Sequence, residues 1–119
     1  MSDDDNDMDE VMAGLRQYFV TTLNDHVAAI REAWRGLREG ADRTAREAAA
    51  DELLRRAHRL AGNGRMVGFA EISDAAGLLE ETLRAAIDGA GLRTLSPAPA
   101  ALVARLLEAC DAARKADGA

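Results

Sequence analysis

Apolar residues recur every three or four positions along four separate stretches of the chain, which is the spacing of one face of an α-helix. A stripe of this kind must be buried against other stripes, so the pattern predicts a fold of packed helices. The first stripe requires a helix of about six turns. Its members are Leu15, Phe19, Leu23, Val27, Ile30, Trp34 and Leu37.

The other three stretches carry the same pattern and include signals for helix starts. Thr44 and Glu47 have the spacing of a capping box at the start of the second stretch. The fourth opens at Ser96-Pro97, an N-cap residue followed by proline at the first helical position. The three stripes are Ala49, Leu53, Ala57, Leu60 and Gly64; Phe69, Ile72, Ala76, Leu79, Leu83 and Ala86; and Pro99, Leu102, Leu106, Cys110 and Ala113.

These stretches predict an all-α protein, an antiparallel four-helix bundle. A chain of 119 residues has room for one such domain. Residues 8–13 are expected to add a short N-terminal helix or turn, with Gly14 as a joint. Aromatic residues make up only 3% of the chain and no apolar residues alternate in period two, which excludes a β-sandwich or barrel.

The formal net charge of −6 is concentrated at the N-terminus. Residues 1–10 hold six acidic residues and no basic one, and the other 15 acidic residues balance the 15 basic residues. We therefore expect an acidic disordered leader over residues 1–7 and a neutral bundle over residues 8–117. The acidity disfavours a nucleic-acid partner, because phosphates need a basic surface.

The sequence also excludes several other classes of protein. No stretch approaches the roughly 20 apolar residues that cross a bilayer, and the acidic start is unlike a secretory signal. With Cys110 as the single cysteine, no internal disulfide can form. We therefore expect a cytoplasmic protein without membrane contact. Cys110 is interpreted as a core residue and His26 as a flank residue of the first helix. No residues have the spacing of a metal site.

His58 is the candidate functional residue. On an ideal helix its side chain points about 140° away from the inner stripe of the second stretch, so we expect it to face solvent. Leu54, Ala61 and Gly62 lie beside it at helical spacing. The segment from Leu53 to Ala70 contains no acidic residue. It contains four arginines: Arg55, Arg56, Arg59 and Arg65. Taken alone, this pattern also fits an ordinary surface histidine in a basic stretch.

Three segments together resemble the signature of histidine-containing phosphotransfer (HPt) domains. They are Ala57-His58-Arg59-Leu60-Ala61-Gly62, Val67-Gly68-Phe69 and Ala76-Gly77-Leu78-Leu79-Glu80. The resemblance covers most of residues 10–115. The start of the third helical stretch, at Gly68-Phe69, looks like that of the phosphotransfer domain of chemotaxis histidine kinases.

The resemblance implies a phosphorelay intermediate in which His58 is the phosphoacceptor. His58 would exchange a phosphoryl group with the aspartate of a response-regulator receiver domain, or with a histidine kinase, which could be a hybrid kinase. The chain would be a monomeric phosphotransfer protein rather than an ATP-binding kinase. It would need no cofactor of its own, with Mg²⁺ expected on the receiver.

The resemblance also implies roles for residues around His58. Arg65, Arg55 and Arg59 would stabilise the phosphoryl group, and Leu54, Ala61 and Gly62 would form the docking surface. The family's usual lysine is replaced by Ala61. Because Arg65 projects only about 20° from His58 on an ideal helix, we expect it to supply the missing positive charge.

Two alternative interpretations remain open from the sequence. The chain could be a non-catalytic HPt-like bundle that regulates a receiver or kinase by occupying it, with Ala61 as a sign of lost chemistry. It could also be a detached amino-terminal domain of a larger chemotaxis-type kinase.

Overall fold

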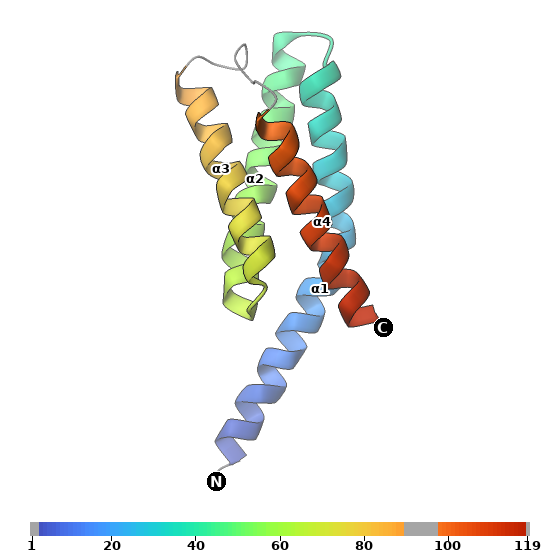
Figure 1. Cartoon of the computed structure of the whole chain (residues 1–119), viewed down its shortest axis with the longest axis vertical. Coiled ribbons are helices and arrows are strands. Elements are labelled where there is room, and N and C mark those ends of the chain that lie inside the picture. The colour runs from blue at the N-terminus through green and yellow to red at the C-terminus, as the bar shows by residue number, and fades with distance from the viewer. Residues whose placement is uncertain (1–2, 90–97, 119) are drawn as a thin grey trace.

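The computed structural model describes residues 3–89 and 98–118, which form four helices. They are α1 (Asp3–Glu39), α2 (Arg43–Val67), α3 (Ala70–Gly89) and α4 (Ala98–Gly118). Helix α2 packs between α1 and α3, and α4 packs against both α3 and α1 (Figure 1). The described residues contain no strand, and the predicted all-α four-helix bundle is confirmed. Within the same residues, no helix is both long enough and apolar enough to span a membrane.

The predicted stripes form the core of the bundle. Leu23, Ile30, Leu53, Leu60 and Leu83 are completely buried. Small residues lie between these large ones and allow close approach of the helices: Ala57, Ala75 and Ala76. Five predicted core residues are only partly buried, namely Trp34, Ala49, Phe69, Ala86 and Leu102. Leu15 is 41% exposed, because it lies near the end of the bundle, where the cover over α1 runs out.

The two ends of α2 are closed by different devices. Asp42 is the N-cap, and its side chain accepts a hydrogen bond of 2.8 Å from the Ala45 backbone N–H. The predicted capping box is therefore wrong, and Glu47 instead accepts a hydrogen bond from Arg43. At the other end Gly68 adopts a left-handed conformation with φ 87°, which favours glycine. This turn reverses the chain into α3.

Helix α1 begins earlier than the sequence suggested. It runs from Asp3 through Gly14 without a break, so the expected additional N-terminal helix is part of α1. Residues 3–7, expected to be a disordered leader, are helical. Acidic residues favour the start of a helix because they interact with the positive end of its dipole. The expected helix start at Ser96-Pro97 lies outside the described residues, and α4 begins at Ala98.

Two ionisable side chains, those of Cys110 and His26, are buried in the bundle. Cys110 is fully buried, as predicted, and burial raises the pKa of its thiol to about 11. His26 is only 5% exposed, and its Nδ1 lies 3.2 Å from Nη1 of Arg56. Burial, followed by the positive charges of Arg56 and Arg59, lowers the pKa of His26, against a smaller opposing effect of Asp25. His26 is thus a buried neutral residue that accepts a hydrogen bond from Arg56.

This buried histidine predicts a loss of stability in acid. The pKa of His26 is lowered from 6.5 on folding, so the unfolded chain binds the proton first as the pH falls. The stabilising contribution of neutral His26 is complete above about pH 6.5 and declines below it. Denaturant unfolding across this range should show a steeper loss for the unaltered protein than for His26→Gln. Identical pH dependence in the two proteins would contradict the assignment.

Candidate functional site

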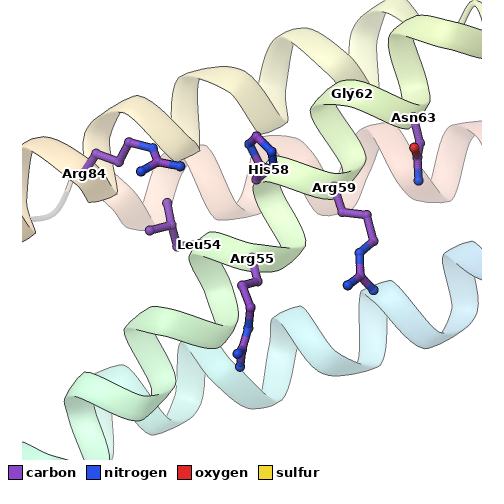
Figure 2. A pocket seen from close by; sticks show the side chains of 7 residues that line it. All are labelled: Leu54, Arg55, His58, Arg59, Gly62, Asn63 and Arg84. Carbon is purple, nitrogen blue, oxygen red and sulfur yellow. The ribbon is translucent and has the colours of Figure 1, made fainter.

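His58 lies on the outer face of α2, as its position on the helix predicted. Leu53, Ala57 and Leu60 point into the core with no measurable exposure, whereas the His58 side chain is 71% exposed. Figure 2 shows its ring standing above the ribbon of α2. A partner can therefore reach the imidazole without any change in the bundle.

A carboxylate from the neighbouring helix orients the imidazole. Nδ1 of His58 lies 2.8 Å from Oε2 of Glu80 on α3, and the Glu80 side chain is only 17% exposed. Burial raises the pKa of Glu80, but hydrogen bonds from Arg84 and His58 outweigh it, and the net pKa is lowered. Glu80 is thus ionised and can only accept, so Nδ1 must carry the hydrogen. In the neutral form of the imidazole, the other ring nitrogen, Nε2, then keeps a free lone pair.

Arg84 is bound to the same carboxylate oxygen as His58. Its Nη2 and Nε lie 2.9 Å and 3.2 Å from Oε2 of Glu80. Arg84 is four residues beyond Glu80, so the two side chains are neighbours on one face of α3. In Figure 2 the guanidinium of Arg84 extends toward the His58 ring. One positive charge is therefore held beside the histidine from α3.

The α2–α3 hairpin brings these residues together. His58 and Glu80 lie at similar distances along the chain from the Gly68 turn, so antiparallel packing places them side by side. One hydrogen bond closes the turn, and a second one joins α3 to α2. Phe69 N–H donates to the Gly64 carbonyl at 2.8 Å, and the Ser73 hydroxyl donates to the Ala61 carbonyl at 2.8 Å.

A hollow of about 410 Å³ surrounds the exposed imidazole (Figure 2). Four of the residues expected around His58 line it, and two further residues join them. The six are Leu54, Arg55, Arg59, Gly62, Asn63 and Arg84. Arg55 and Arg59 extend toward α1 in Figure 2, and Arg55 donates to Glu52 at 2.7 Å. The hollow is open, basic and partly apolar.

Two expected site residues lie elsewhere. Arg65 lines a different hollow, with Glu81 on α3 and Arg105 on α4. Ala61 is partly buried, and it packs against the core. The helical angle correctly places Arg65 on the side of α2 that meets α3, but it cannot show that Arg65 lies beyond the hollow around His58. Grouping Arg65 with the residues around His58 is therefore not supported by the geometry.

Sequence reasoning did not assign Glu80, Arg84 or Asn63 to the site. Glu80 carried a signal, because it belongs to the leucine-glutamate pair of the signature. Arg84 carried a weaker one, its spacing of four residues from Glu80. Nothing along α2 alone could show that either residue reaches His58.

As for metals, the part of the chain that the structure describes contains no group of three His, Cys, Asp or Glu side chains that could hold an ion.

Comparison with known proteins identifies the family. The family model described as Hpt domain matches residues 14–116. This range includes most of each of the four helices. The chain belongs to the Hpt domain family. Searches of curated proteins and of solved structures found no match. Hpt domains are histidine phosphotransfer modules of phosphorelays, they carry no kinase domain, and they interact with receiver domains and histidine kinases.

Replacing Gly62 tests whether the fold of this Hpt domain requires a glycine at that position. A Cβ atom built on Gly62 meets no atom within 4 Å apart from the neighbouring backbone of its own helix, and the residue lies inside α2. We expect Gly62→Ala to raise the free energy of unfolding by about 0.5–1 kcal/mol, because alanine is the better helix former. Denaturant unfolding measures this gain.

Gly36 is the matched control for this change. A Cβ atom at Gly36 would lie 3.1 Å from Cβ of Ala49, so Gly36→Ala should lose part or all of the same gain. A gain at Gly62 means that the fold does not require glycine there, which leaves partner approach as its reason. A loss of stability in Gly62→Ala would instead assign Gly62 to the fold.

Proposed function

We propose that this Hpt domain carries a phosphoryl group on Nε2 of His58 and exchanges it with the aspartate of a receiver domain. A histidine kinase is the alternative donor. One observation carries the proposal: the imidazole is exposed, and its Nδ1–H is held by the ionised, mostly buried carboxylate of Glu80. This contact selects the tautomer whose nucleophilic nitrogen faces solvent.

In the proposed transfer, the Nε2 lone pair attacks the phosphorus atom of an aspartyl phosphate. The new P–N bond forms as the P–O bond to the aspartate breaks, and the aspartate leaves as a carboxylate. The imidazole ring gains positive charge, which the carboxylate of Glu80 stabilises through Nδ1–H. The reverse reaction returns the group to another receiver. The proposal assigns no cofactor to this chain and places Mg²⁺ on the receiver.

The arginines around His58 suit the charge of this reaction. A phosphoryl group on Nε2 brings negative charge into a hollow lined by Arg55, Arg59 and Arg84. We assign the principal role to Arg84, which is held beside His58 by Glu80. It would supply from α3 the charge that Ala61 does not supply from α2. Leu54 and Gly62 provide apolar and open surface for docking of a receiver.

The proposal is tested by incubating the protein with a phosphorylated receiver, or with a histidine kinase and radiolabelled ATP. The expected label is stable in base, labile in acid and absent from His58→Gln. The control His26→Gln should keep the label, because His26 is buried.

In the same assay, Glu80→Gln should slow the labelling by about 10- to 100-fold, the loss expected for a hydrogen bond to a charged group.

The outcome also decides between transfer and occupancy. Binding of a receiver without any label would support a non-catalytic bundle, the function that the alanine at position 61 favours. Label that persists in His58→Gln would place the phosphoryl group on another residue. Either result would contradict transfer through His58.

The proposal gives the main role in stabilising the phosphoryl group to Arg84, whereas the sequence pattern favoured Arg65. We expect Arg84→Ala to slow transfer from a receiver by roughly tenfold, since it removes a charge-assisted interaction. Arg84→Lys should recover much of that loss. Arg65→Ala should have a smaller effect, because Arg65 lines a different hollow. If Arg65→Ala slows the transfer more than Arg84→Ala, the assignment based on sequence is the correct one.

A further inference from the structure

Two arginines of α2 share one carboxylate beside the hollow around His58. Nη2 of Arg55 lies 2.7 Å from Oε2 of Glu52, and Nε of Arg56 lies 2.8 Å from Oε1 of the same side chain. Hydrogen bonds from Arg56 and then from Arg55 lower the pKa of Glu52, against an opposing effect of burial. Glu52 is therefore ionised, and its single negative charge is shared by two positive charges.

The two arginines are held with different firmness. The Arg56 side chain is 25% exposed, and its Nη1 makes a second contact of 3.2 Å with Nδ1 of the buried His26. On an ideal helix Arg56 points about 160° away from His58, so it cannot reach the imidazole. The Arg55 side chain is 68% exposed. Exposed ion pairs are weak, so little free energy opposes the release of Arg55 from Glu52.

Arg55 lies between two groups that can accept its hydrogen bonds. Glu52 precedes it by three residues and His58 follows it by three, and residues at this spacing are neighbours on the surface of a helix. In Figure 2 the Arg55 side chain extends toward α1 and away from the His58 ring. A neutral imidazole carries no negative charge, so it does not draw Arg55 away from the carboxylate.

A phosphoryl group on His58 changes this balance. Such a group carries roughly two negative charges and three strong acceptor oxygens. It would stand in the hollow that Arg55 already lines. Glu52 has one negative charge and keeps Arg56 when Arg55 leaves. After the exchange, the carboxylate and the phosphoryl group therefore each have a guanidinium partner from α2.

We propose that Arg55 changes partners when His58 is phosphorylated, leaving Glu52 for an oxygen of the phosphoryl group while Arg56 stays on Glu52. Only hydrogen bonds are exchanged, and neither a proton nor a covalent bond moves. The inference rests on the proposed function of His58 and makes Glu52 a positioning residue. Because Glu52 competes for Arg55, it limits how strongly the domain holds the phosphoryl group and favours passing it on to a receiver.

The equilibrium of phosphotransfer with a receiver tests this competition. The measured quantity is the ratio of label on His58 to label on the receiver's aspartate. Arg55→Ala should lower the ratio by roughly fivefold, and Glu52→Gln should raise it by up to about fivefold, the range of an exposed ion pair. When Arg55→Ala is already present, Glu52→Gln should no longer raise the ratio, because the competition requires Arg55.

Asp51→Asn is the matched control, because it removes the same charge at the next residue of α2. Asp51 is exposed and lies two turns from His58 on the same face of the helix. A general effect of negative charge on the phosphoryl group would therefore appear in this variant too. We expect Asp51→Asn to change the ratio much less than Glu52→Gln. Circular dichroism verifies that all variants remain helical.

NMR spectroscopy follows the two arginines directly. Phosphorylation of His58 should shift the side-chain Nε–H signal of Arg55 much further than that of Arg56. In Glu52→Gln, the Arg55 signal should already differ from that of the unaltered protein before phosphorylation. A loss of structure alone would not separate the two arginines in this way.

Three results would overturn the exchange of partners. They are an equal rise of the ratio in Asp51→Asn and Glu52→Gln, an effect of Glu52→Gln that persists without Arg55, and an Arg55 signal that phosphorylation leaves in place. Each of these can occur while His58 still carries the label, and the proposed function then stands. Absence of label from His58 would contradict both the proposed function and the exchange.

Discussion

The left-handed turn at Gly68 determines how the candidate functional site is assembled. It ends α2 and starts α3 within very few residues, so the two helices pack antiparallel with little freedom to slide. The Ser73–Ala61 hydrogen bond and the buried apolar residues of both helices hold that register. A shift by one turn would move Glu80 about 5.4 Å from His58 and break their hydrogen bond. The orientation of the imidazole therefore depends on the geometry of the hairpin.

The polar contacts around His58 show how a mostly buried carboxylate can be kept ionised. Burial by itself disfavours the charge on Glu80, and hydrogen bonds from Arg84 and His58 compensate for it. Arg84 and His58 approach the same oxygen, so the contacts that compensate for the charge of Glu80 also bring a guanidinium and the His58 imidazole together. His26 is the opposite case, because burial, and after it the charge of Arg56, lowers the pKa of its ring and keeps it neutral. The two histidines thus differ in exposure and in hydrogen-bond partner.

Helix α1 contributes to the core and also carries exposed apolar residues near its start. Its middle part supplies core residues such as Leu23 and Ile30, and its first turns extend beyond the α2–α3 turn (Figure 1). A hollow of about 330 Å³ between α1 and α2, lined by Leu15 and Tyr18, shares Arg59 and Asn63 with the hollow around His58. The two hollows are therefore neighbours on one side of the bundle.

The sequence by itself determined the four helices, their buried stripes and the outward direction of His58, because all of these follow from the helical repeat within one segment. It did not determine which side chains meet across the helices. Glu80 and Arg84 reach His58 only because the hairpin has the register that Gly68 and core packing impose. For the same reason Arg65, close to His58 in helical angle, lies at another hollow. A helical repeat fixes directions around one axis, whereas contacts between helices depend on how several buried faces are satisfied together.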